Sequence, residues 1–296
     1  MTKVSHIPPE LGALSELQEL RLDNNKLTGT IPAELGKLEA LKTLDLEHNK
    51  LSGPIPKELG ALRRLGALLL HRNNLTGSIP KELGDLTKLR QLELHWNRLT
   101  GSIPPEVGEL AALQFLDLSH NQLTGPIPPE LGKLTALVNL RLWHNQLSGT
   151  IPKELGALRQ LGMLWISDNQ LSGLWHTLGQ DQIGSMAARR GTLPVDLARL
   201  LDMLDGLSSW KVGRNPWEHP PEAIVGGGLQ VVRGYYEAMF MGGTTAVTRP
   251  LKVVIVGKET VGKTRYEGHL KFCPFSSFYM CSLDFAELFS SLFPHR

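Results

Sequence analysis

The sequence has few cysteines and almost no net charge. Cys273 and Cys281 are the two cysteines among 296 residues, and both lie near the C-terminal end. The rest of the chain therefore has no cysteines for the disulfides that secreted proteins often use, and we expect a cytoplasmic location. A formal net charge of +2 argues against a partner such as nucleic acid or an anionic membrane surface.

Long hydrophobic segments are also missing. No run approaches the roughly 18–20 apolar residues that cross a membrane, so the sequence predicts no membrane span. Residues 1–11 contain two prolines and no apolar segment, unlike a secretory signal peptide. Residues 6–14 match only the second half of the repeat described next, and we expect that sequence preceding them is absent.

A 24-residue unit recurs through most of the chain. It begins with the pattern L-x-x-L-x-L-x-x-N, which is typical of leucine-rich repeats. The first leucine of the unit recurs at Leu17, Leu41, Leu65, Leu89, Leu113, Leu137 and Leu161. The asparagine recurs at Asn25, Asn49, Asn73, Asn97, Asn121, Asn145 and Asn169. One copy cannot bury its leucines alone, so we expect the copies to stack into one continuous core.

The two ends of this pattern predict different local structures. Residues 89–94, Leu-Arg-Gln-Leu-Glu-Leu, end in the alternation of apolar and polar residues that is typical of a half-buried strand. Asn97 follows where the chain must turn, and its short amide can satisfy backbone groups that a turn leaves unpaired. We therefore interpret the asparagines as structural and not as catalytic residues.

The second half of the unit reads L-[ST]-G-x-I-P-x-E-L-G-x-L, as in residues 99–110. This form resembles the plant-type subclass of leucine-rich repeats. The resemblance implies an α/β solenoid, a right-handed arc with one parallel strand per repeat on its inner face. At about 4.8 Å between strands, seven repeats give an inner face roughly 30–35 Å long, which suits a protein ligand better than a metabolite.

Side chains that flank the strand leucines are predicted to face solvent on the inner face. Exposed tryptophans at the centre of a face are typical of protein-binding hot spots, and five residues on the later repeats are candidates for partner binding: Trp96, His120, Trp143, His144 and Trp165. The alternative is an ordinary solvated face with occasional tryptophans. A metal site at His95, His120 and His144 is disfavoured, because no carboxylate or cysteine cluster accompanies these histidines.

The repeat register breaks after Gly173, and the template returns at residues 207–215, L-x-x-W-x-V-x-x-N. Apolar residues at helical spacing then follow Pro220 and Pro221 and predict a helix that covers the last repeat. The predicted organisation is leucine-rich repeats over 1–173, an insertion over 174–192, a final repeat and helical cap over 193–241, and a linker over 242–250.

A phosphate-binding motif follows the linker. Residues 251–256, Leu-Lys-Val-Val-Ile-Val, predict a buried strand. The complete G-x-x-x-x-G-K-[ST] pattern comes next, as Gly257, Lys258, Glu259, Thr260, Val261, Gly262, Lys263 and Thr264. In such a loop the backbone N–H groups surround phosphates, Lys263 would contact the β- and γ-phosphates, and Thr264 would coordinate Mg²⁺.

The repeats, the segment 215–225 and the motif at 251–264 together resemble a leucine-rich-repeat GTPase of the ROCO (Roc-COR) family. The resemblance implies GTP and Mg²⁺ as ligands, and GTP hydrolysis by the Roc domain. Residues 265–296 contain no counterpart of the guanine-reading motif, the switch regions or the COR domain. We therefore expect residues 251–296 to be an incomplete P-loop α/β fragment with an aberrant tail and without useful hydrolysis.

The sequence thus predicts a leucine-rich-repeat scaffold that binds a protein on its concave face and is joined to a truncated GTP-binding domain. One alternative is a binding module whose P-loop is vestigial. A second is the ectodomain of a receptor-like kinase, which the plant-type repeats favour. The missing signal peptide, the missing cysteine caps and the P-loop argue against this second alternative.

Overall fold

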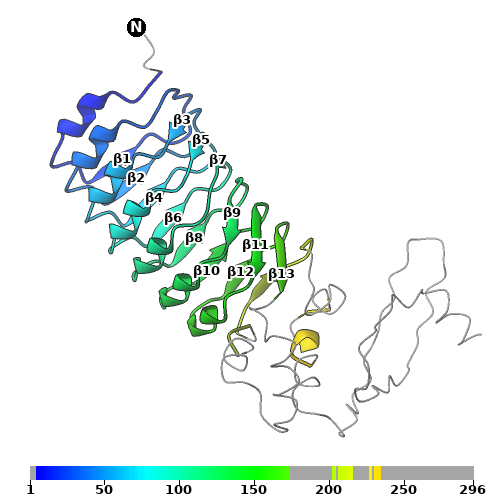
Figure 1. The fold of residues 1–296 in the computed structure, drawn as a ribbon. Coiled ribbons are helices and arrows are strands. Elements are labelled where there is room, and N and C mark those ends of the chain that lie inside the picture. Colours follow the sequence, from blue (N-terminus) through cyan, green and yellow to red (C-terminus); the bar gives the residue numbers. More distant parts are fainter. Residues whose placement is uncertain (1–4, 174–201, 205, 216–226, 229, 235–296) are drawn as a thin grey trace, which may run out of the picture. The chain divides into compact units, whose positions relative to one another are not determined.

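A computed structural model describes residues 5–173, 202–204, 206–215, 227–228 and 230–234 (Figure 1). The chain divides into two units, Met1–Gly242 and Gly243–Arg296, and all described residues belong to the first. The predicted insertion, linker and phosphate-binding loop lie outside the described residues. None of the helices in the described ranges combines the length and the apolar character that a membrane span needs.

The described part of the chain contains one long parallel sheet with one strand per repeat, as the sequence predicts. From β1 to β12, neighbouring strands pair residues that are 24 positions apart, such as Leu44 with Leu68 and Leu68 with Leu92. In order, the strands are β1 (Glu19–Arg21), β2 (Thr43–Asp45), β4 (Ala67–Leu69), β6 (Gln91–Glu93), β8 (Phe115–Asp117), β10 (Asn139–Arg141), β12 (Met163–Trp165) and β14 (Ser209–Lys211).

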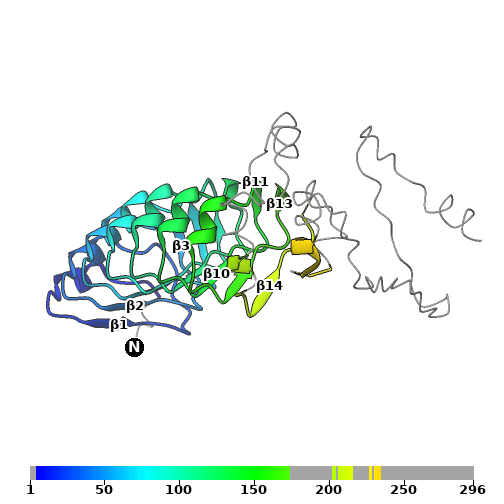
Figure 2. The same ribbon diagram turned by 90° about the horizontal axis from the view of Figure 1, so that it is seen from below.

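Short 3₁₀ helices form the opposite side of the solenoid (Figure 2). A proline precedes each one, and Pro104, for example, holds φ −63° and ψ 133° at the helix start. Proline suits this place because its φ is fixed and its missing N–H is not needed there. The helices are η1 (Pro9–Ala13), η2 (Ala33–Lys37), η3 (Lys57–Ala61), η4 (Lys81–Asp85), η5 (Pro105–Glu109), η6 (Pro129–Lys133) and η7 (Lys153–Ala157).

Two small parallel sheets connect the inner face to the helical side. The first contains β3 (Ser52–Pro54), β5 (Asn74–Gly77) and β7 (Arg98–Leu99). The second contains β9 (Thr124–Pro126), β11 (Gln146–Thr150) and β13 (Gln170–Gly173). Each repeat from β2 to η7 is thus a flattened coil of strand, turn, second strand and 3₁₀ helix around a leucine core. In the fifth full repeat Leu113, Leu116, Leu118 and Leu123 are fully buried.

The asparagine column is structural, which confirms the interpretation from the sequence. The side-chain Nδ2 of Asn97 donates to the carbonyls of Leu70 at 3.0 Å and Leu94 at 3.1 Å. Its Oδ1 accepts from the backbone N–H of Leu75 at 2.9 Å. One amide therefore joins two successive turns and leaves the buried backbone groups around it paired.

The sheet continues beyond the break in the repeat register. Strand β14 pairs with β12 and places Ser209 beside Met163. Asn215 extends the asparagine column, because it accepts from Leu171 N–H at 3.1 Å and donates to the Ile166 carbonyl at 3.0 Å. Residues 230–234 are helical, and Val232 is fully buried in the same core. The remaining residues of the predicted helical cap lie outside the described ranges.

The 3₁₀ helices η1 to η6 each have a glycine near the end, at a position where the next turn leaves no room for a Cβ atom. A Cβ atom at Gly84 in η4 would clash with the carbonyl oxygen of Glu106 in η5 and lie 2.8 Å from its Cβ. At Gly66, which precedes β4, a Cβ would lie 3.5 Å from the nearest atom, the carbonyl oxygen of Lys42. The two glycines therefore form a matched pair for testing the packing of the helical side.

We predict that Gly84→Ala lowers the free energy of unfolding by about 1–3 kcal/mol, because the added methyl group forces successive turns apart. Gly66→Ala serves as the control and should change stability by less than about 1 kcal/mol, since its methyl group meets only ordinary contacts. Urea unfolding followed by circular dichroism measures both. Equal effects of the two substitutions would show that the close stacking is not needed.

Candidate functional site on the concave face

The inner face of the long sheet contains a continuous group of rings, here called the aromatic patch: Trp96, His120, Trp143, His144 and Trp165. Trp96 stacks on His120 with ring centroids 3.7 Å apart and 13° between the planes. His120 meets Trp143 edge-on at 4.1 Å and His144 at 4.5 Å. Trp143 meets Trp165 edge-on at 6.3 Å. The structure thus brings together all five residues selected from the sequence, while their role in partner binding stays a prediction.

The repeat turn presents three of these rings in an unusual backbone conformation. Trp96, His120 and His144 have φ values of +54°, +51° and +57°, in the left-handed region that residues other than glycine seldom adopt. Their N–H groups continue the ladder between repeats, as His120 N–H donates to the Trp143 carbonyl at 3.0 Å. The turn therefore holds one side chain per repeat at the end of each strand, and the sequence pattern did not reveal this conformation.

Cations cover the last ring of the aromatic patch. The Nζ of Lys211 lies 3.7 Å from the ring centroid of Trp165, and the guanidinium carbon of Arg141 lies 4.9 Å from it. The indole N–H of Trp165 donates to the Ser209 hydroxyl at 2.8 Å, which fixes the ring. Trp96, at the other end of the patch, is 50% exposed. The patch therefore offers an open apolar surface at Trp96 and a positively charged one near Trp165.

Not every side chain that flanks the strand leucines faces solvent. Asp117 and Ser119 are buried, with 6% and 2% exposure, so the prediction of solvent exposure is wrong at both positions. The Asp117 carboxylate accepts from the Ser119 hydroxyl at 2.6 Å and from Ser119 N–H at 3.0 Å. It also pairs with Arg141 at 3.4 Å. These bonds fold both side chains back onto the sheet beneath their larger neighbours.

Carboxylates and histidines gather on the earlier repeats, in a group we call the histidine–carboxylate cluster: Glu47, His71, Glu93, His95 and Asp117. His71 and His95 stack with centroids 4.2 Å apart. Glu93 Oε2 lies 3.8 Å from the Nδ1 atoms of both histidines. The expectation that no carboxylate accompanies the inner-face histidines is therefore wrong. The sequence contained a signal for this cluster, because Glu47, His71 and His95 follow one another at 24-residue spacing and so occupy equivalent positions in adjacent repeats.

Burial sets the protonation of these groups. It lowers the pKa of His95 to about 4, against the opposing charge of Asp117, so His95 is neutral near pH 7. Burial likewise raises the pKa of Glu93. In the aromatic patch, burial and then the nearby His144 lower the pKa of His120. A neutral imidazole such as that of His95 can stack on rings or donate a lone pair to a metal.

The sequence was then compared with known proteins. A family model described as a leucine-rich repeat region matches residues 1–102 and 81–180, which together span more than half of the chain. The chain belongs to the leucine-rich-repeat family. The comparison with curated proteins found no match.

Solved leucine-rich-repeat structures resemble the chain. One is the ectodomain of the Arabidopsis thaliana membrane receptor kinase GASSHO1/SCHENGEN3 in complex with CASPARIAN STRIP INTEGRITY FACTOR 2. It has 36% identity and a TM-score of 0.62, and the match covers 72% of this chain and 23% of that one. Another is the ectodomain of the Arabidopsis receptor kinase HAESA in complex with an N-terminally extended IDA peptide hormone. It has 35% identity and a TM-score of 0.60, and the match covers 72% of this chain and 32% of that one.

A bacterial structure is also similar. A leucine-rich-repeat protein of Leptospira interrogans has 33% identity and a TM-score of 0.50, with coverage of 72% of this chain and 58% of that one. The chain thus spans about a quarter to a third of the two receptor ectodomains. These matches support the leucine-rich-repeat part of the predicted ROCO resemblance and give no support to its GTPase part.

Proposed function

We propose that the chain is a leucine-rich-repeat recognition module that binds an extended peptide or protein segment along its concave face. The observation that supports this most directly is the aromatic patch, in which Trp96 is half exposed beside a continuous row of rings. Large rings held rigidly by a scaffold bury much area at little entropic cost when a partner binds.

The similar receptor ectodomains give independent support to a peptide ligand. The two described above were solved with CASPARIAN STRIP INTEGRITY FACTOR 2 and with an IDA peptide hormone. This favours the alternative of a receptor-like recognition module over a scaffold defined by a GTPase domain. In this chain the ligand would lie across β6 to β12, with apolar groups on Trp96 and Trp143 and an acidic group near Arg141 and Lys211. The cytoplasmic location stays a prediction.

Replacing two rings of the aromatic patch tests this function. Peptides selected from a random display library on the immobilised chain are synthesised and titrated by calorimetry against the wild type and the Trp96→Ala/Trp143→Ala variant. We expect the variant to bind at least about thirtyfold more weakly, since a hot-spot residue contributes about 2 kcal/mol or more.

The matched control is Leu14→Ala, because Leu14 is as exposed as Trp96, at 50%, but caps η1 away from the inner face. This substitution should leave the affinity unchanged. If the selected peptides bind the tryptophan variant as tightly as the wild type, while its circular dichroism spectrum is native, the aromatic patch is not the binding surface.

A second candidate function, guanine-nucleotide binding, rests on the complete motif at Gly257–Thr264 and on the apolar run of residues 251–256 before it. We propose that this loop binds GTP with Mg²⁺, with Lys263 at the β- and γ-phosphates and Thr264 on the metal ion. Hydrolysis is not part of this proposal, because the residues after Thr264 contain no recognisable water-positioning or guanine-reading motif.

Titration with a fluorescent GTP analogue in the presence of Mg²⁺ tests the loop. We expect saturable binding that is lost in Lys263→Ala, because the lysine neutralises the phosphate charge. Lys258→Ala is the matched control within the same loop and should retain binding. Absence of binding to the wild type, or binding that survives in Lys263→Ala, would leave the loop without a nucleotide function.

A further inference from the structure

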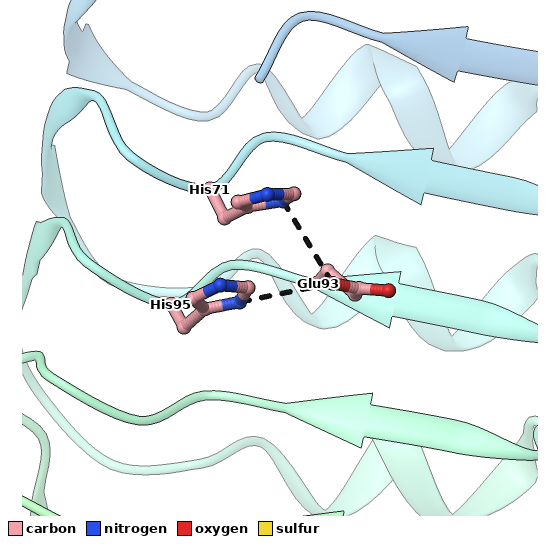
Figure 3. Close-up of side chains that lie close together, drawn as sticks. All are labelled: His71, Glu93 and His95. Carbon is pink, nitrogen blue, oxygen red and sulfur yellow. Dashed lines mark ion pairs between the residues drawn. The ribbon is translucent and has the colours of Figure 1, made fainter. Parts of the chain in front are cut away.

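Three potential metal ligands converge in the histidine–carboxylate cluster. His71 follows β4, and Glu93 and His95 lie at and just after the end of β6, so the three side chains come from two neighbouring repeats (Figure 3). One ligand atom from each residue lies within 4.8 Å of the others. The 24-residue register explains this convergence, because it places His71 and His95 at equivalent positions of adjacent turns.

The contact between His71 and Glu47 determines which nitrogen of His71 is available. His71 Nε2 lies 2.8 Å from Glu47 Oε2, and a carboxylate accepts, so Nε2 carries the hydrogen. In the neutral ring Nδ1 then has a free lone pair. This Nδ1 atom is buried without a hydrogen-bond partner among the described residues, and it faces Glu93 Oε2 at 3.8 Å.

His95 contributes a nitrogen atom from the next repeat. Its Nδ1 is also buried without a hydrogen-bond partner in the described ranges, and it lies 3.8 Å from Glu93 Oε2 and 3.7 Å from Asp117 Oδ2. Two imidazole nitrogen atoms and two carboxylate groups thus lie around one small space. Buried polar atoms left this way are costly, and a cation at their centre would satisfy all of them.

We propose that His71 Nδ1, Glu93 Oε2 and His95 Nδ1 bind a divalent first-row transition-metal ion of the Zn²⁺ type. Imidazole and carboxylate are ligands that suit such ions. With a metal ion on Nδ1, the contact of His71 Nε2 with Glu47 would give the carboxylate–histidine–metal arrangement that orients a ligating ring. Three protein ligands leave a further coordination position for water or for a donor atom of a bound partner.

Metal binding requires the two imidazoles to rotate. The rings are nearly parallel, with 13° between their planes, whereas the Nδ1 lone pairs lie within those planes and must point at a single ion. The terminal torsion of a histidine side chain is broad, so the rings can open on their Nδ1 side while the backbone register is kept. The ion would therefore replace the ring stack with two coordination bonds.

Calorimetric titration of the full chain with ZnCl₂ tests the site. The protein is purified without a histidine tag and freed of metal with a chelator. Wild type is compared with Glu93→Gln and His95→Ala, which remove a carboxylate and an imidazole ligand. It is also compared with Glu47→Gln, which removes the carboxylate charge behind His71, and with His48→Asn as the control. His48 is an exposed histidine in the turn of the preceding repeat, with φ +52°, a conformation that asparagine tolerates.

We expect Glu93→Gln and His95→Ala each to lose one equivalent of Zn²⁺ relative to the wild type, and Glu47→Gln to weaken that equivalent by about 10–100-fold. His48→Asn should bind as the wild type does. Zn²⁺ ions bound elsewhere in the chain are common to the wild type and the variants, so they do not affect the difference in the number of bound ions. Glu93→Gln keeps the shape of the side chain and so tests the site even if His95→Ala fails to fold. If the wild type binds no Zn²⁺, or if Glu93→Gln binds the same number of ions with the same affinity, the proposal is wrong.

Discussion

The hydrogen bonds of the asparagine column are the interaction on which the rest of the structure depends. Each buried asparagine joins its own turn to the turn before it, as Asn121 does by donating to the Leu118 carbonyl in its own repeat and, in the preceding repeat, by donating to the Leu94 carbonyl and accepting from Leu99 N–H. A backbone that turns sharply around a leucine core would otherwise bury unpaired N–H and C=O groups. The column continues to Asn215 although the repeat register breaks after Gly173, which shows that the stack requires this amide more than it requires a strict period.

This fixed register turns residues that are 24 positions apart into neighbours in space. The stacked pair of His71 and His95 and the stacked pair of Trp96 and His120 are both products of it. A solenoid therefore builds its surface column by column, and a few substitutions at one column position create a local site without disturbing the core. The aromatic patch and the histidine–carboxylate cluster are two such sites on one sheet, each with its own proposed ligand.

Much of the fold and part of the candidate site could be predicted from the sequence. The period gave the strands, the parallel pairing and the role of Asn97, because these features depend only on which residues recur. The five members of the aromatic patch could also be selected from the sequence, because they occupy recurring positions that flank or follow the strand leucines. The burial of Asp117 and Ser119 and the approach of Glu93 to two histidines could not be predicted, because they depend on how side chains of different columns turn toward one another. The left-handed backbone at Trp96 could not be predicted either, because the residue at this turn position differs between repeats, as at Asn24, Arg72 and Asp168.

The central claim, that the asparagine column holds the repeats in register, is tested most directly by replacing Asn97 and Asn25 in turn with alanine and measuring urea unfolding. Asn97 is buried and bonded on both sides, whereas Asn25 is exposed and donates to the carbonyls of Leu22 and Asp23 in its own turn. We expect Asn97→Ala to lower the free energy of unfolding by about 2–4 kcal/mol, because several buried groups lose their partners at about 1–3 kcal/mol each, and Asn25→Ala to lower it by less than about 1 kcal/mol. Equal, small losses at both positions would contradict the claim.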